Sequence, residues 1–259
     1  MNKNLIGIFA TFIVFLIVVN AYSLFGFYNK SNALQTLRDE RFSMVLKADE
    51  LRQSSDDLTR FARTYAVTGE TKYKENYFSV LAIRNGESGR PYSYEGIYWN
   101  LLEPIRSQRH RTKSPEVLDA EMQKLPYTHT ELAMLTKAKV LSDTLVGLEV
   151  KAFNAMDGKF VDVEGKYTLQ KEADQKLAIA LLHSKRYHIE KAKVMLPIDD
   201  FIFSVNQRTS LKINVLKKEL DMSFYIFIFT LFSSIITVLL FLYVDRKHIK
   251  EGLSALNRH

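Results

Sequence analysis

The chain has 259 residues, of which 47% are hydrophobic and 25% charged, with a formal net charge of +7 and no cysteine. This composition suits one medium-sized domain with membrane spans, and the lack of cysteine excludes disulfides, cysteine zinc sites and thiol catalysis. Basic residues are interspersed with acidic ones, and no zinc-finger, recognition-helix or RNA-binding signature accompanies them, so we expect no nucleic-acid partner.

The first predicted element is a membrane span. After residues 1–4 the chain carries no charged residue from position 5 to position 28. A secretory signal peptide has an apolar core of about 7–15 residues followed by a small-residue cleavage site. This run is longer, and no clear cleavage site precedes Asn29. We therefore interpret residues 5–28 as an uncleaved transmembrane helix.

A long amphipathic helix is predicted next. Between residues 34 and 65 apolar positions recur at alternating intervals of three and four, interrupted at Arg41 and Ser55. That period is typical of the seam of a left-handed helical bundle. The helix should end before Gly69, because glycine accepts the left-handed conformation that terminates helices. Thr71 is expected to cap a second helix over residues 72–83.

The segment 85–127 is the least regular part of the chain and contains its single Trp. Aromatic faces and guanidinium groups together can bind organic anions. One interpretation is therefore a ligand-binding site, formed by Arg84, Arg90, Tyr94, Tyr98 and Trp99. The alternative is that these rings pack the segment onto the helices, as aromatic side chains commonly do.

Helical periodicity returns over residues 128–156, and a polar loop follows to about residue 170. A fourth helical region is predicted from Lys171 to the membrane, with a kink or restart at Pro197. We therefore predict an all-α fold, in which an up-down-up-down four-helix bundle with an irregular insertion lies between two transmembrane helices.

Polar residues interrupt the apolar stripes or lie beside them. Buried charges are costly unless they are paired, so these residues are expected to form an internal network or to face a ligand cavity. The set comprises Ser55, Asp57, Arg60, Ser142 and Glu149.

The second predicted span covers residues 222–244, which carry no charge. As a helix it is roughly 34 Å long, enough to cross a hydrocarbon core of roughly 30 Å. An apolar stripe leads into it and predicts a signal-relay helix, whose face comprises Ile202, Val205, Thr209, Ile213, Leu216 and Leu220. Because such stripes are often buried against a symmetric copy, we expect a homodimer.

Two spans place residues 1–4 and the tail, residues 245–259, on one side and residues 29–221 on the other. The short N-terminus with Lys3 favours the cytoplasm for both ends. The tail would then begin a linker to an output domain.

A family resemblance rests on residues 51–60 (LRQSSDDLTR), residues 63–70 (RTYAVTGE) and Tyr73. They resemble the helical extracytoplasmic sensor regions of bacterial transmembrane signalling receptors, particularly CHASE-type bundles, in which a similar Tyr and Thr-Gly-acid pattern marks the first hairpin tip. Residues 83–86 and 96–99 also look like segments of such sensors. The resemblance implies a two-pass protein of the bacterial cytoplasmic membrane, placed before a histidine kinase, diguanylate cyclase or chemotaxis-type output domain. This chain shows none of those output signatures.

Enzymatic chemistry is not indicated. None of the six His residues has metal-site spacing, and the adjacent carboxylates at Asp56-Asp57 and Asp199-Asp200 point apart on a helix. We expect no catalytic residue, metal or cofactor. The favoured hypothesis is a membrane-anchored sensory module that responds to a small-molecule or protein ligand and acts on an output domain or partner. The alternative is a standalone membrane scaffold or adaptor without signalling output.

Overall fold

The computed structural model describes residues 3–91, 94, 97–101 and 118–256. Seven helices account for most of these residues, so the prediction of a mainly helical chain is confirmed. Parts of the predicted insertion, at residues 92–93, 95–96 and 102–117, lie outside the described residues. The same is true of residues 1–2 and 257–259 of the predicted cytoplasmic ends.

The chain divides into two compact units. Unit 1 comprises Met1–Asp39 with Thr209–His259, and unit 2 comprises Glu40–Arg208. Helix α1 (Lys3–Thr68) and helix α7 (Lys185–Leu256) each contribute residues to both units. The two units are described separately below.

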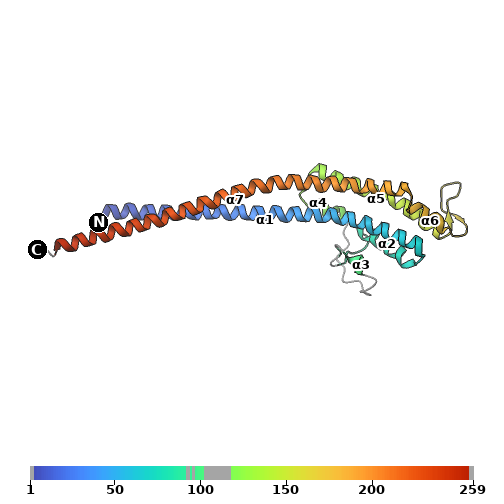
Figure 1. The fold of residues 1–259 in the computed structure, drawn as a ribbon, viewed down its shortest axis with the longest axis horizontal. Coiled ribbons are helices and arrows are strands. Elements are labelled where there is room, and N and C mark those ends of the chain that lie inside the picture. Colours follow the sequence, from blue (N-terminus) through green and yellow to red (C-terminus); the bar gives the residue numbers. More distant parts are fainter. Residues whose placement is uncertain (1–2, 92–93, 95–96, 102–117, 257–259) are drawn as a thin grey trace. The chain divides into compact units, whose positions relative to one another are not determined.

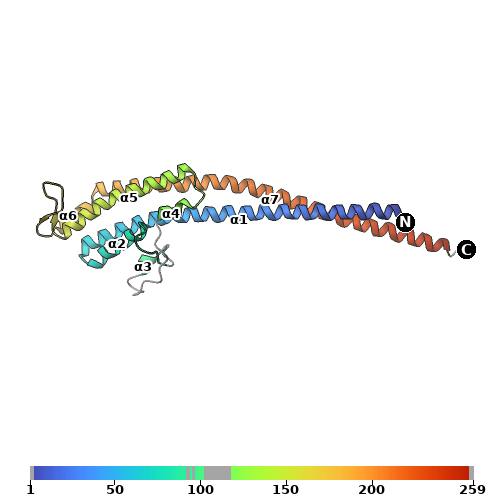
Figure 2. The same ribbon diagram turned by 180° about the vertical axis from the view of Figure 1, so that it is seen from behind.

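In unit 1, α1 and α7 run antiparallel and side by side (Figures 1 and 2). Phe9 packs on Phe241 at 5.2 Å between ring centroids, and Phe27 packs on Phe224 at 5.9 Å. Most other apolar side chains here are exposed. Among the described residues, α1 and α7 are the two helices that are long and apolar enough to cross a membrane.

Polar contacts of Asn20 join these two apolar stretches. The amide nitrogen of Asn20 donates to the hydroxyl of Ser234 at 2.7 Å and to the Leu16 carbonyl at 2.8 Å. The amide oxygen of Asn20 accepts from the Thr230 hydroxyl at 3.0 Å. Both N–H groups and the oxygen of this amide are therefore satisfied, as an apolar environment requires.

In unit 2, α1 ends at Thr68 as predicted. Gly69 follows with φ +71, and its N–H donates to the Tyr65 carbonyl at 2.8 Å, which terminates the helix. Helix α2 covers Thr71–Arg84. The prediction that Thr71 caps α2 is wrong, because Thr71 is already helical and Glu70 occupies the N-cap position.

The described part of the insertion contains α3 (Tyr98–Leu101) and α4 (Leu118–Gln123). Helix α5 follows at His129–Met156, close to its predicted bounds. A capping box begins it: the Thr128 hydroxyl accepts from the Glu131 N–H, and the Glu131 carboxylate accepts from the Thr128 N–H.

A short hairpin replaces the loop predicted before residue 170. Strand β1 (Lys159–Phe160) pairs antiparallel with β2 (Leu169–Gln170). Gly158, at φ +69, precedes the hairpin, and a Cβ there would collide with the backbone carbonyl of Lys171. The close approach of these two backbones therefore requires glycine at this position.

The helical region predicted to start at Lys171 instead begins with α6 (Gln175–Leu182). The Lys171 N–H donates to Gly158 and the Asp174 N–H to Ala155, which holds the chain before α6 out of a helix. Ser184 then accepts from the Tyr187 N–H at 3.1 Å at the start of α7. Helix α7 continues through Pro197, so the predicted restart does not occur.

Two hydrophobic clusters form the core of unit 2. The Tyr77 cluster joins α1, α2, α5, α6 and α7 around Phe61, Tyr65, Tyr77, Phe153, Leu182 and Tyr187. The Phe201 cluster joins α1, α4, α5 and α7 around Met44, Leu51, Met122, Leu135, Ile198 and Phe201. The insertion is thus tied to the second cluster through α4.

The predicted relay face of α7 is turned inward. Val205 belongs to the Phe201 cluster, Ile202 packs against it, and Thr209 is fully buried. Thr209 belongs to unit 1, where the remaining members, Ile213, Leu216 and Leu220, are partly buried. The stripe is thus covered to a large extent by the chain's own residues.

Two phenylalanines on α7 test this orientation. Phe201 is fully buried, and its ring packs on Tyr127 at 5.3 Å, whereas Phe203 is 67% exposed. Phe201→Ala should lower the free energy of unfolding by about 3–5 kcal/mol, because it leaves a cavity. Phe203→Ala should change it by no more than about 0.5 kcal/mol. Denaturant unfolding of the full chain in detergent measures both, and similar losses would contradict the orientation.

Candidate functional site

The centre of the candidate site is the carboxylate of Glu149, in the middle of α5. Its residue is 1% exposed. The Tyr77 hydroxyl of α2 donates to its Oε2 at 2.7 Å, and the Tyr187 hydroxyl of α7 donates to its Oε1. Burial raises the pKa of Glu149, although the two tyrosines oppose this shift. One acidic group thus links three helices.

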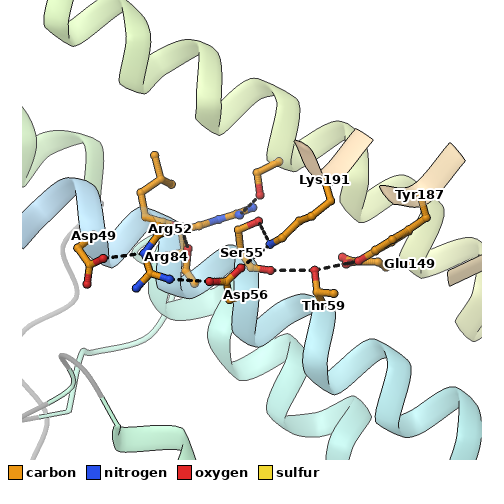
Figure 3. Close-up of polar contacts among 12 residues, drawn as sticks. Asp49, Arg52, Ser55, Asp56, Thr59, Arg84, Glu149, Tyr187 and Lys191 are labelled. Carbon is orange, nitrogen blue, oxygen red and sulfur yellow. Dashed lines mark hydrogen bonds and ion pairs between the residues drawn. The ribbon is translucent and has the colours of Figure 1, made fainter. Parts of the chain in front are cut away.

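A polar chain continues from this carboxylate along α1 (Figure 3). The Tyr187 and Thr59 hydroxyl oxygens lie 2.9 Å apart, and Thr59 lies 3.0 Å from the Ser55 carbonyl. Lys191 of α7 donates to the Ser55 hydroxyl at 2.8 Å and pairs with Asp56 at 3.0 Å. Burial lowers the pKa of Lys191, and Asp56 opposes this effect. Two positions of α7 are therefore held to α1 and α5 by polar groups.

Arg84 supplies a second buried cation from the end of α2. Its side chain is 1% exposed, and its Nη1 donates to the Ser142 hydroxyl of α5 at 2.8 Å. Its Nη2 pairs with Asp143 at 2.7 Å. Ser142 and Glu149 lie about two helical turns apart on α5 and so share one face. Polar contacts to α2 therefore follow this face of α5.

The predicted internal network is brought together in part. Tyr187 lies between Glu149 and Thr59, the Ser55 hydroxyl is held by Lys191, and Ser142 is held by Arg84. Tyr77, Tyr187, Thr59 and Lys191 were not among the sequence candidates. Their burial depends on which face of each helix turns inward, and their residue types alone do not mark them as buried polar groups.

Asp57 and Arg60 form a pair of their own on α1. Arg60 Nη2 donates to Asp57 Oδ1 at 2.7 Å, and its guanidinium lies over the Phe61 ring at 4.5 Å. Burial raises the pKa of Asp57, and Arg60 opposes the shift. The Arg60 side chain is 42% exposed, so this pair is reached by solvent.

The predicted aromatic set lies in the described part of the insertion. Tyr94, Tyr98 and Trp99 are all buried, and the Trp99 N–H donates to the Tyr94 hydroxyl at 3.2 Å. The Trp99 ring meets Phe61 of α1 edge to face at 5.5 Å. These rings therefore pack on α1 within the Tyr77 cluster. Arg84, the fifth candidate, instead contacts α5 as described above.

Arg90 belongs to an ionic cluster that fastens α4 to α1. Its guanidinium lies 2.7 Å from Glu50 and 2.5 Å from Glu121. Lys47 pairs with the same two carboxylates. Burial would raise the pKa of Glu121, but Lys47 and Arg90 hold it below its usual value. Two acids and two bases thus neutralise one another in a largely buried position.

Within the part of the chain that the structure describes, no group of three or more His, Asp or Glu residues is arranged to hold a metal ion. The groups around Glu149 bring carboxylate, hydroxyl and ammonium groups within hydrogen-bonding distance of one another in two sets, Tyr77 and Tyr187 on Glu149, and Lys191 on Ser55. No protein-family model, curated protein or solved structure matches this chain.

Glu149→Gln should alter the pH dependence of stability. Because the folded pKa is raised above 4.5, the native state binds more protons than the unfolded state from about that pH upward. Wild-type stability therefore falls as pH rises through the window between the two pKa values, and Glu149→Gln should remove this loss. The stability difference, mutant minus wild type, should grow with pH in thermal unfolding of the full chain in detergent.

Glu164→Gln is the matched control, because that carboxylate is exposed on the hairpin. Its unfolding curve should run parallel to the wild-type curve between mildly acidic and neutral pH. A Glu149→Gln curve that also runs parallel would contradict the assigned shift.

Substitution of two arginines distinguishes a buried ion pair from a solvent-exposed one. Arg208 donates to the fully buried carboxylate of Glu131 through Nε and Nη2, both at 2.9 Å. Arg208→Ala should cost about 3–5 kcal/mol in unfolding free energy, because it strands that carboxylate. Arg60→Ala should cost under about 1 kcal/mol, since Arg60 is largely solvated. If both substitutions lowered the free energy of unfolding equally in denaturant unfolding, Asp57 would be a buried charge that needs Arg60 as its partner.

Proposed function

We propose that this protein is a membrane-anchored sensory module of a bacterial signalling receptor. Residues 5–28 and 222–244 cross the cytoplasmic membrane, and residues 29–221 form an extracytoplasmic sensor of the CHASE type. The observation that carries the proposal is that α1 and α7 each contain both a candidate span and core residues of unit 2. A change in core packing therefore acts on helices that also enter the membrane.

The sensor works as an up-down-up-down four-helix bundle built from α1, α2, α5 and α7. Support comes from the Tyr77 cluster, to which all four helices contribute. The polar chain adds directional hydrogen bonds from α7: Tyr187 donates to Glu149, and Lys191 donates to Ser55. A stimulus that breaks or exchanges these contacts shifts α7 by about 1–2 Å or rotates it.

A small molecule or a partner protein supplies the stimulus, and an output domain or separate partner receives it. The aromatic set with Arg90 is the place where a stimulus acting on the insertion would reach α1, since it fastens the insertion to that helix. A homodimer is part of the proposal. Val205 and Thr209 are buried in their own chain, so a second copy contacts other positions of α7. The exposed side chains of Ile189, Leu196 and Phe203 are available for that contact.

The relay is tested by changing helix phase. Residues 31–37 of α1 and 211–217 of α7 belong to unit 1, where the helices run antiparallel. Removing these seven residues from both helices keeps their pairing and returns each face to within about 20°. Removing only Leu37 and Leu211 rotates each helix by about 100°. With a diguanylate cyclase fused after residue 256, the seven-residue pair should retain the output of the undeleted fusion, and the one-residue pair should lock or abolish it.

Cyclase activity is measured in membranes, both without stimulus and under envelope stress, at matched protein levels. Equal output from the two paired deletions, in a fusion whose activity depends on the sensor, would show that the helices only tether the domain. The scaffold alternative would then be preferred.

A further inference from the structure

A groove of about 330 Å³ lies between α1 and α7 in unit 1. Its walls include Tyr22, Phe25, Gly26, Asn29, Lys30 and Ser223. This volume falls at the lower end of the range for small-ligand sites, roughly 300–1,000 Å³. It is large enough for a head group and the adjoining glycerol of a lipid, but too small for whole acyl chains.

The groove coincides with the ends of both apolar runs. Lys30 is the first charged residue after the first span, and Asp221 is the last before the second. Exposed aromatic rings gather at the same level: Tyr22, Phe25, Tyr28 and Tyr225. Such rings are typical of the boundary between hydrocarbon and head groups. In the proposed topology the groove therefore opens where lipid phosphates lie.

The groove is polar at one end and apolar at the other. The Lys30 ammonium and the Asn29 amide provide donors, whereas Tyr22 and Phe25 provide apolar surface. Lys30 already faces Glu219, but at 3.8 Å and with both side chains well exposed. That separation exceeds the usual length of a charge-assisted hydrogen bond, about 2.7–2.9 Å, so the ammonium retains donors for an anion.

Gly26 keeps the groove open. A Cβ placed at this position meets nothing within 4 Å. A Cβ at Gly26 is therefore accommodated without collision, and a larger side chain would extend from it into the space of the groove. This provides a way to block the site that does not alter its charge.

We propose that this groove binds one phospholipid of the surrounding membrane. Its phosphate is held by Lys30 and Asn29, and its glycerol end lies along Tyr22 and Phe25 over Gly26. An anionic lipid such as phosphatidylglycerol is preferred, since a choline head group would bring a cation toward Lys30. The inference rests on the membrane-spanning part of the proposed function and adds a ligand that the membrane itself supplies.

The test is native mass spectrometry of the full chain in detergent, titrated with phosphatidylglycerol and with diacylglycerol of the same acyl chains. Wild type should bind phosphatidylglycerol in preference to diacylglycerol, which lacks the phosphate. Lys30→Gln should weaken phosphatidylglycerol binding about fivefold, the usual contribution of one lysine beside an anionic lipid. Gly26→Leu should weaken it at least as much.

Lys218→Gln is the matched control, because it removes one positive charge from the same boundary without lining the groove. It should leave the affinity unchanged. Equal weakening by Lys218→Gln and Lys30→Gln, or no effect of Gly26→Leu, would overturn the proposal. Alkaline extraction of membranes separates this failure from failure of the proposed function. A chain that is extracted does not span the membrane, whereas an integrated chain that fails to discriminate these lipids contradicts the lipid site alone.

Discussion

The buried carboxylate of Glu149 is the constraint on which unit 2 depends. A charged group without water is tolerated only when hydrogen bonds replace its hydration. Here the replacements come from Tyr77 and Tyr187, so α2, α5 and α7 must keep the spacing that brings both hydroxyls to one acid. Apolar contacts tolerate small displacements between packed helices, whereas the hydrogen bonds to a buried acid do not. Glu149 therefore specifies one arrangement of helices that apolar contacts alone would leave less defined.

Much of the helical fold was predictable because its signals are local. The three-four periodicity, Gly69 and the Thr128 cap define where α1 ends and α5 begins. The segment before α6 was not predictable, since Lys171 and Asp174 donate to Gly158 and Ala155, which are distant in sequence. Such backbone bonds outcompete a helical preference, and they become visible only when the hairpin and the end of α5 are in place.

The site was predictable to the extent that a buried polar residue interrupts an apolar stripe. Ser55 stood out on that ground, and Ser142 and Glu149 stood out because they lie close to the apolar face of the third helix; all three are buried. Their partners did not stand out, because a tyrosine in an amphipathic helix reads equally well as core or surface. Arg60 shows the reverse case: it lies beside the stripe, yet its length lets the guanidinium reach solvent. Periodicity locates a side chain on a face, whereas contact geometry decides its role.

The amide of Asn20 limits how the two apolar helices of unit 1 can move. Its hydrogen bonds to Ser234 and Thr230 are 2.7 and 3.0 Å long. In the proposed membrane, an axial slide of α7 past α1 by even half a helical turn would break both, with no water there to replace them. A tilt or rotation shared by the two helices preserves them. A tilt or rotation of both helices together therefore costs less free energy than sliding α7 alone along α1.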